Sequence, residues 1–190
     1  MGNGLLSVKK LRPPICPSSI HKNEPMLKFA LSLLAVSLLL TGCLKKEMKC
    51  PYLNTNNVAP TSEQEALAQY LTDNNIVATK HRSGLYYQIL SDGSGTDSAG
   101  LCSDIAIGYV GRLTNGTIFD QQDQAVFVLG SLIEGWKQGI PLIRKGGKIR
   151  LYIPPTLGYG SKDIKNNDDE VVIPAQSILI FDISLINFTV

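Results

Sequence analysis

Apolar and polar residues alternate along much of the chain from residue 84 onward. The alternating segments are rich in β-branched and aromatic residues, and Gly, Asn and Pro separate them, which is typical of strands with one buried face. These segments read GLYYQIL, DIAIGYVGRL, AVFVLG, GKIRLYIP and SILIFDISLINF. The pattern predicts an antiparallel sheet, and Asn115-Gly116 predicts a hairpin with a type I′ turn.

Two stretches show helical spacing instead. In residues 61–75, Ser62 is suited to cap the helix N-terminus, with Glu65 three residues later, and apolar side chains recur every three or four positions. These apolar residues are Ala66, Leu67, Tyr70 and Leu71. We expect this stripe to pack on the sheet domain, with a dimer contact as the alternative. The second stretch, LIEGWKQGIPLI, predicts a helix of about two turns that Gly139 and Pro141 bring to an end.

Together these elements predict an α+β domain over residues 84–190, in which an antiparallel sheet packs against one short helix. A helix and a connector over residues 61–83 precede the domain as a short helical extension. Further upstream, residues 43–60 lack hydrophobic periodicity and are rich in Asn, Lys and Pro, which favours a flexible tether.

The stretch from Met26, MLKFALSLLAVSLLLTGC, has the pattern of a secretory signal peptide. Lys28 supplies a positive charge, and the uncharged run that follows, residues 29–40, is too short to span a membrane as a helix. Its ending resembles the lipobox of bacterial lipoproteins, in which the cysteine, here Cys43, receives the lipid. We therefore expect residues 1–42 to be a signal region, with Met26 as a candidate start codon. An uncleaved anchor is the alternative, and either would tether the domain to a membrane.

The lipobox predicts a lipid-anchored protein of the bacterial cell envelope. Leu44 stands where an aspartate would retain an enteric lipoprotein in the inner membrane, so an outer-membrane location facing the periplasm is favoured. An exported domain can form disulfides, and Cys50 and Cys102 remain available for one. Two separate thiols are the alternative, because sequence does not show whether the two side chains meet.

The charge distribution argues against nucleic acid as a partner. The formal net charge is +2, but the chain from Cys43 onward holds 13 basic and 15 acidic residues and no basic stripe. Without clustered basic residues, binding to a phosphate backbone loses its electrostatic driving force.

The chain lacks the residues that most kinds of hydrolytic and metal-dependent chemistry need. Beyond Cys43 the one histidine is His81, which lies in a polar connector, so a Ser-His-Asp or Cys-His arrangement is disfavoured. No cluster of Cys, His or acidic residues has the spacing of a metal site, and we expect neither a metal nor a cofactor. The remaining candidates for function are aromatic residues and one acid, Asp120, which follows Phe119 directly.

An aromatic set of this kind could be core or binding site. Aromatic residues are commonly buried, which favours the core. Three features favour a site: Tyr159 lies between two glycines in a loop, Trp136 lies on a short glycine-bounded helix, and Asp120 is a charge where a sheet core would have none.

The order of four motifs resembles the FKBP family of peptidyl-prolyl cis/trans isomerases. The motifs are GYVGRLTNGTIFD, FVLGSLIEGWKQGI, KGGKIRLYIPPTLGYG and IPAQSILIFDISLI, and the match covers roughly residues 84–188. The lipobox and the helix before the domain resemble the exported lipoprotein members. The resemblance implies an antiparallel sheet wrapped around one short helix, with the substrate pocket between them.

The resemblance also implies roles for single residues. Trp136 matches the floor of the pocket. Leu132 and Ile133 match the pair before the helix, where the N–H of Ile133 would hold a substrate carbonyl. Tyr159 matches a loop tyrosine whose hydroxyl bonds the ligand, and Asp120 matches an acid beside the bound amide, which makes these two the expected catalytic residues. The pocket walls match Tyr109, Phe119, Phe127, Ile173 and Phe181.

Three departures from the family pattern border this pocket. Ala125 and Leu157 stand where many members have aromatic residues, and the segment SKDIKNNDDE, residues 161–170, is longer and more acidic than the usual connection. The resemblance implies an isomerase that assists folding of exported proteins, with proline-containing polypeptides as substrates, and we expect a monomer. A peptide-binding or holdase module without catalysis is the first alternative, and a scaffold lipoprotein with an aromatic core is the second.

Overall fold

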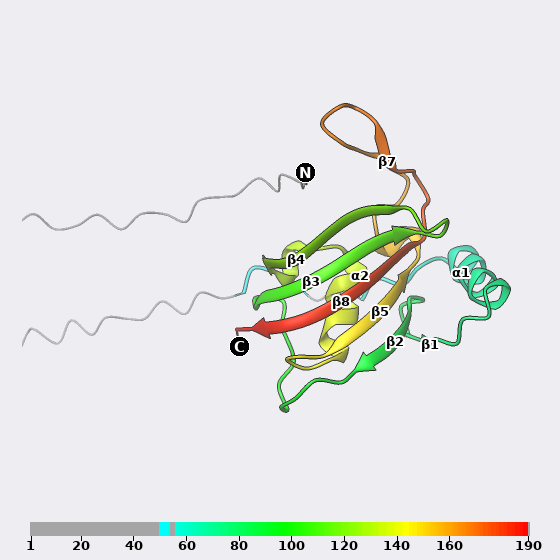
Figure 1. Cartoon of the computed structure of the whole chain (residues 1–190). Helices are drawn as coiled ribbons and strands as arrows, with labels where there is room; N and C mark the ends of the chain where they lie inside the picture. Colours follow the sequence, from blue (N-terminus) through cyan, green and yellow to red (C-terminus); the bar gives the residue numbers. More distant parts are fainter. Residues whose placement is uncertain (1–49, 54–55, 190) are drawn as a thin grey trace, which may run out of the picture. The chain divides into compact units, whose positions relative to one another are not determined.

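The computed structural model describes residues 50–53 and 56–189 (Figure 1). The predicted signal region over residues 1–42, the predicted lipid-carrying Cys43 and the following residues up to 49 lie outside the described residues. Among the described residues, no helix has both the length and the apolar character needed to cross a membrane.

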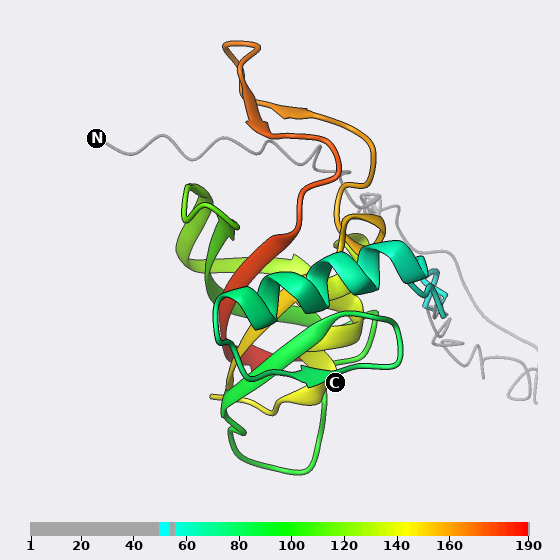
Figure 2. The same ribbon diagram turned by 90° about the vertical axis from the view of Figure 1, so that its right-hand side faces the viewer.

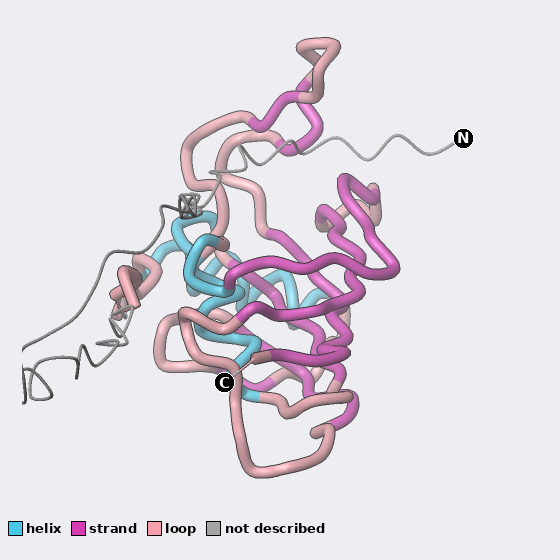
Figure 3. The backbone as a smooth tube through the Cα atoms, turned by 90° about the vertical axis from the view of Figure 1, so that its left-hand side faces the viewer, coloured by secondary structure: helices cyan, strands magenta, loops and turns pink. Residues whose placement is uncertain are grey.

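A six-stranded sheet forms the centre of the described part (Figure 3). Its strand order is β1-β2-β5-β8-β3-β4 (Figure 1). All neighbouring strands are antiparallel. The strands are β1 (Thr79–Lys80), β2 (Tyr86–Ser91), β3 (Asp104–Leu113), β4 (Ile118–Val128), β5 (Lys148–Ile153) and β8 (Leu179–Phe188). The alternating segments are therefore strands of one antiparallel sheet, as predicted.

The core lies on one face of this sheet, called the inner face here. Along β8 the residues alternate between buried and half-buried up to Leu185, as a strand with one face in the core requires. Helix α2 (Glu134–Gly139) and the 3₁₀ turn η2 (Ile140–Leu142) cover the inner face. A Cβ atom on Gly135 or Gly139 would lie 2.6 Å from Ile153 or Leu151 of β5, so the glycines let the helix approach the sheet closely.

Strand β4 carries two irregularities in its pairing with β3. The register shifts between Ile107 and Tyr109, and again between Gly111 and Arg112, so β4 has an extra residue at each place. Such bulges bend a strand and redirect its side chains, and they often lie beside functional sites. The second bulge falls at Phe119, next to Asp120.

The hairpin between β3 and β4 forms as predicted, but its predicted turn type is wrong. Gly116 has a φ of 86°, whereas Asn115 is not among the residues with positive φ. The N–H of Gly116 donates to the carbonyl of Leu113, and the N–H of Leu113 donates to the carbonyl of Thr117. The turn thus uses three residues with one left-handed glycine, because the bulge at Phe119 changes the register that a type I′ turn would need.

Helix α1 (Thr61–Asp73) packs on the outer face of the sheet, beside β5 and β8 (Figure 2). Leu67 and Leu71 are buried against Tyr152, Ile178 and Ile180. The prediction that this stripe packs on the domain is confirmed.

The expected N-terminal cap of α1 is wrong. Ser62 is the second residue of the helix, Pro60 occupies the cap position, and no side chain caps the end. Proline suits this place because its fixed φ leads into the helix without an N–H to satisfy. Ala66 is also exposed rather than part of the buried stripe, because it faces away from the sheet while Leu67 faces it.

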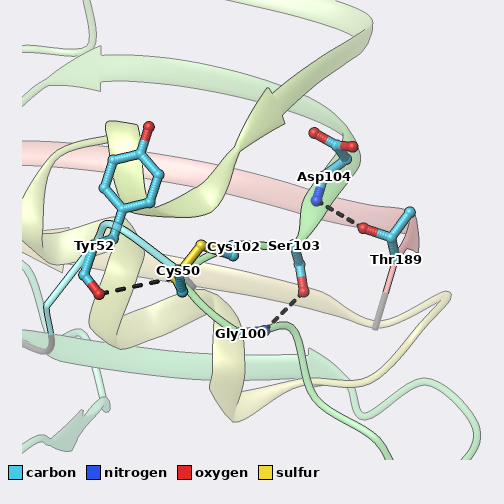
Figure 4. The surroundings of a disulfide bond; sticks show 7 residues. All are labelled: Cys50, Tyr52, Gly100, Cys102, Ser103, Asp104 and Thr189. Atoms are coloured by element: carbon cyan, nitrogen blue, oxygen red, sulfur yellow. Dashed lines mark hydrogen bonds between the residues drawn. A yellow bond between two sulfur atoms is a disulfide. The ribbon is translucent and has the colours of Figure 1, made fainter. Parts of the chain in front are cut away.

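The residues before α1 are attached to the domain. Cys50 and Cys102 form a disulfide with their Cα atoms 5.7 Å apart, so the pairing left open by the sequence is present (Figure 4). The N–H of Ala59 donates to the carbonyl of Ser83, and the amide of Gln138 on α2 donates to the carbonyl of Asn57. The prediction of a flexible tether is therefore wrong for residues 56–60, since polar composition does not show which backbone groups find partners on the domain.

The segment between the third and fourth motifs is an ordered hairpin rather than a plain loop. Strand β6 (Ile164–Lys165) pairs with β7 (Val171–Ile173) as a separate two-stranded sheet, which projects from the main sheet (Figure 2). The side chain of Asn166 orders its tip by accepting hydrogen bonds from the N–H groups of Asp168 and Glu170. The short 3₁₀ turn η3 (Pro155–Leu157) precedes the hairpin.

Candidate active site

Five aromatic rings on the inner face of the sheet form one continuous cluster. Trp136 of α2 lies between two of them: its ring centroid is 5.1 Å from that of Tyr109 and 5.0 Å from that of Phe181, both edge-to-face. Phe119 extends the cluster from Phe181 at 5.5 Å, and Phe127 extends it from Tyr109 at 6.4 Å. Edge-to-face pairs at these distances are favourable beyond the area that they bury.

A glycine creates the room for two of these rings. A Cβ atom on Gly111 of β3 would lie 2.6 Å from the ring of Phe119 and 2.7 Å from that of Phe181. Gly111 was not among the site residues predicted from the sequence, although a glycine within a strand of β-branched residues is itself a sign of a close approach. Gly111 therefore belongs to the architecture of the cluster.

The predicted wall and floor residues differ in exposure. Trp136, Tyr109, Phe181 and Ile173 are buried, with 5%, 8%, 3% and 1% of their surfaces exposed. Half-buried residues pack around them and line the exposed margin of the cluster: Phe119, Phe127, Leu132, Ile133 and Tyr159. The structure thus brings all nine apolar and aromatic site residues predicted from the sequence into contact with one core cluster.

Asp120 is held at this margin by Tyr109, whose hydroxyl donates a 2.7 Å hydrogen bond to Oδ2 of Asp120. Burial raises the pKa of Tyr109, and the hydrogen bond to Asp120 raises it further. The Tyr109 hydroxyl therefore stays protonated at neutral pH and fixes one oxygen of the carboxylate. The charge of Asp120 at the edge of an aromatic cluster is explained by this bond and by its half-buried position.

Two hydrogen-bond donors at the margin have no partner in the described part of the chain. The hydroxyl of Tyr159 makes no hydrogen bond there, and neither does the backbone N–H of Ile133, which precedes α2. Burial raises the pKa of Tyr159, and the charge of Asp120 raises it as well, so this hydroxyl is also a donor at neutral pH. These donors are available to a carbonyl oxygen that reaches the cluster.

A third donor lies deeper. Nε1 of Trp136 is, among the described residues, the one buried side-chain nitrogen or oxygen without a hydrogen-bond partner. A buried unpaired donor costs free energy, about 1–3 kcal/mol. The indole is therefore not held by hydrogen bonding and owes its position to ring packing.

A separate cavity of about 440 Å³ lies on the outer face, between β3, β4 and β8. Gln122, Asp123 and Ser184 contribute polar groups to its lining, and Val110 and Ile186 contribute apolar ones. It is on the side of the sheet away from the indole and contains none of the unpartnered donors. We therefore place the candidate site at the aromatic cluster. No group of three or more His, Cys, Asp or Glu side chains is suited to a metal ion among residues 50–53 and 56–189.

Comparison with known proteins identifies the architecture. Residues 97–186 match the family model described as FKBP-type peptidyl-prolyl cis-trans isomerase. The solved structure of AtFKBP13 superposes with a TM-score of 0.54 at 34% identity, and the match covers 60% of this chain and 99% of that one. The chain belongs to the FKBP-type peptidyl-prolyl cis-trans isomerase family. The α+β fold predicted from the sequence, an FKBP-like sheet with one short helix, is thereby confirmed.

Two bacterial FKBP relatives are also similar to the chain. The FKBP-type isomerase FkpA of Buchnera aphidicola is 43% identical over 113 residues, which is 57% of this chain and 42% of the relative. The crystal structure of FkpA from Escherichia coli has a TM-score of 0.56 at 30% identity, covering 67% of this chain and 58% of that one. The chain spans less than half the length of the curated relatives that it matches.

Proposed function

We propose that this protein is a peptidyl-prolyl cis/trans isomerase that assists the folding of exported proteins. The observation that carries the proposal is the aromatic cluster around Trp136, bordered by two unpartnered donors, in a chain of the FKBP family. Its substrates would be polypeptides that contain proline. The reaction breaks no bond, which agrees with a cluster built without a nucleophile or an acid–base pair.

The physical task is to lower a rotational barrier. Rotation about an X–Pro bond meets a barrier of about 18–20 kcal/mol, because the amide loses resonance as it twists. An enzyme accelerates this step only if it binds the twisted amide more tightly than either planar isomer, and about 1.4 kcal/mol of preference gives each tenfold in rate. A dry aromatic surface supplies such a preference, since the twisted amide has a less polar carbonyl and depends less on water.

Different residues of the aromatic cluster and its margin would contribute to different parts of this task. The proline ring would contact Trp136, of whose surface 5% is exposed, with the half-buried rings of Phe119 and Phe127 at its sides. The N–H of Ile133 would hold a substrate carbonyl, which fixes one side of the rotating bond. The hydroxyl of Tyr159 would bond the carbonyl on the other side.

Asp120 would lie beside the bound amide, with Tyr109 holding its carboxylate in place. In the planar amide, resonance places partial negative charge on the carbonyl oxygen. A carboxylate near that oxygen disfavours this charge separation, which decreases as the bond twists, and thus favours the twisted form. We propose this as an electrostatic role, so Asp120 transfers no proton.

The two small departures from the family pattern affect the margin and the core differently. Leu157 is fully buried, so an aromatic residue is replaced there by an aliphatic one within the core. Ala125 is half-buried at the margin, where a short side chain leaves the site wider between Phe127 and the β4 bulge. We propose that bulky residues before the proline are accommodated at Ala125.

A protease-coupled assay with a proline-containing peptide tests the proposal on the full chain in detergent micelles. The parent should accelerate isomerisation, and Tyr159→Phe and Trp136→Ala should reduce kcat/KM. Prevention of client aggregation without isomerisation would instead support a holdase. If the parent shows neither effect, the isomerase and the holdase are both excluded and a scaffold lipoprotein is left.

We further propose that the protein is anchored in the bacterial cell envelope by lipid on Cys43, in the outer membrane facing the periplasm, and that it is a monomer. The support is the lipobox sequence that ends at Cys43 and the disulfide, which suits an oxidising compartment. Metabolic labelling with a radioactive fatty acid should label the parent and not Cys43→Ala. Separation of inner and outer membranes then tests the sorting, and light scattering tests the monomer.

A further inference from the structure

The residues that precede helix α1 contact both the turn before helix α2 and the end of that helix. We call residues 50–53 and 56–60 the N-terminal strap. Its first anchor is the disulfide between Cys50 and Cys102 (Figure 4). Its last anchor is Ala59, which is buried and bonded through its N–H to the carbonyl of Ser83.

The disulfide joins the strap to the segment that holds the turn before α2. Cys102 lies between Leu101 and Ser103, and the carbonyls of both neighbours accept hydrogen bonds from that turn. The N–H of Gly130 donates to Leu101 at 2.7 Å, and the N–H of Leu129 donates to Ser103 at 3.0 Å. These two residues begin the 3₁₀ turn η1 (Leu129–Ser131), which leads directly into Leu132 and Ile133.

The strap also contacts η1 directly through Tyr52. A Cβ atom built on Gly130 would lie 2.3 Å from Cγ of Tyr52, so the tyrosine ring lies against the backbone of the glycine. Gly130 is not among the glycines with positive φ, so its backbone conformation does not itself require glycine. The reason for a glycine here is the room that Tyr52 needs.

The strap also holds the C-terminal end of α2. Gln138 of α2 donates to the carbonyl of Asn57 in the strap at 3.1 Å. On its other side, α2 packs through Gly135 and Gly139 directly against the side chains of Ile153 and Leu151 of β5. The segment 129–138 is thus fixed between the sheet on one side and the strap on the other.

From this arrangement we infer that the strap positions the N–H of Ile133 for the substrate carbonyl, with Tyr52 and the disulfide as positioning groups. The inference rests on the proposed isomerase function. It adds a role for residues that lie before residue 97, where the family match begins. The N–H of Ile133 has no partner within the described residues, but its carbonyl accepts hydrogen bonds from the N–H groups of Trp136 and Lys137. The place of Ile133 therefore depends both on η1 before it and on α2 after it, and the strap contacts both.

The expected effect is mainly on substrate binding. A hydrogen bond from Ile133 to a carbonyl is made with both the planar and the twisted amide, so misplacing it removes uniform binding and raises KM more than it lowers kcat. Tyr52→Ala should raise KM by about tenfold, which corresponds to one well-placed hydrogen bond. The Cys50→Ser, Cys102→Ser double variant should shift KM in the same direction.

The decisive experiment compares three variants of the full chain in detergent micelles, with kcat and KM measured separately. Tyr52→Ala removes the ring, Tyr52→Phe keeps it, and Leu53→Ala alters the neighbouring side chain, which is 81% exposed. Tyr52→Phe and Leu53→Ala should retain the parent KM. ¹⁵N relaxation of residues 129–133 should show increased motion in Tyr52→Ala alone.

A double-mutant cycle gives a second test that does not depend on stability. Gly130→Ala should displace Tyr52 and raise KM, and adding Tyr52→Ala to it should cost less than the two single effects together. Leu71→Ala, which loosens the α1 cluster on the outer face, is the control for lost stability and should leave KM unchanged.

The outcomes separate the two proposals. An inactive parent refutes the isomerase function. An active parent whose KM is unaffected by Tyr52→Ala and by loss of the disulfide refutes the positioning role alone. An equal rise of KM in Tyr52→Ala and Leu71→Ala also refutes it, because a general loss of stability would then explain both.

Discussion

The two faces of the sheet differ in whether their polar groups are hydrogen-bonded within the protein. On the outer face, polar groups are paired: Asp182 accepts hydrogen bonds from Arg112 and Arg150, and the hydroxyl of Tyr152 donates to Gln88. On the inner face, donors of Ile133, Tyr159 and Trp136 have no partner in the described part of the chain.

The difference shows where binding energy is available. A polar group that is already hydrogen-bonded within the protein stabilises the fold and gains little by binding a ligand. An unpartnered donor beside an apolar surface gains a hydrogen bond when a ligand carbonyl binds there. Both faces carry one helix, α1 outside and α2 inside, so a helix on a sheet does not by itself mark a site. Variants of the inner face should therefore change activity, and variants of the outer face should change stability alone.

The largest expected effect is that of Trp136→Ala. Removing a buried indole leaves a cavity, which should lower the free energy of unfolding by about 3–5 kcal/mol. It should also reduce kcat/KM of the folded fraction, because the proposed floor for proline is gone. Denaturant unfolding and the peptide assay well below the melting temperature measure the two effects. Full activity in the folded protein would remove Trp136 from the site.

Leu71→Ala is the matched change on the outer face. The side chain is 4% exposed, and its loss should lower the free energy of unfolding by about 2–5 kcal/mol. Activity at low temperature should match that of the parent, since the α1 cluster does not include the inner-face rings. A fall in kcat/KM comparable to that of Trp136→Ala would contradict the separation of the faces.

Asp182→Asn should destabilise the outer face by about 1–3 kcal/mol, since two arginines lose a charged partner. Burial raises the pKa of Asp182, but the hydrogen bonds from Arg150 and Arg112 outweigh it, and the net pKa lies below the ordinary value. A lowered carboxyl pKa gives stability that is present above about pH 4 and is lost as the pH falls through the folded pKa.

Melting temperatures of parent and Asp182→Asn should therefore converge as the pH is lowered below about 4. The side chains of this network are between 25% and 40% exposed, so high salt should also reduce the difference. A difference that does not change with pH would show that the network contributes by packing rather than by charge.

The smallest expected effect is that of Tyr159→Phe. It removes one unpartnered hydroxyl and no packing, so stability should be unchanged while kcat/KM falls by about tenfold, which corresponds to a hydrogen bond of about 1.4 kcal/mol. The raised pKa of Tyr159 implies that the parent keeps this donor as the pH rises from 7 to 9. A parent activity that declines over that range, with no decline in Tyr159→Phe, would assign the hydroxyl a lower pKa.

The strands could be predicted because their period is local. β3 and β8 alternate between buried and less buried residues as the sequence pattern requires, and the burial of Leu67 and Leu71 follows from helical spacing. The predictions that were wrong concern the exact register of two strands and the exact start of a helix. The turn at Gly116 differs from the expected type because β4 is bulged against β3, and Ser62 does not cap α1 because Pro60 begins it.

The site residues show the same division. Residues such as Trp136 and Tyr159 could be predicted as site residues because their types and their order in the chain resemble those of a known family. No feature of the sequence indicated the contact of Tyr52 with Gly130, because the two residues are far apart in the chain and neither residue type is unusual for its segment. The polar composition of residues 43–60 even favoured a free tether.

The sequence by itself determined strands β2, β3, β4, β5 and β8, the two main helices, the aromatic set and the cysteines that could pair. These properties depend on residue type and on periods of two and about 3.6 residues, which are local. The tertiary structure decided which donors remain unpartnered, which glycines make room for a ring, and that Cys50 does meet Cys102. Such facts depend on groups that only folding brings together, because a hydrogen bond or a contact is set by distance in space and not by distance along the chain.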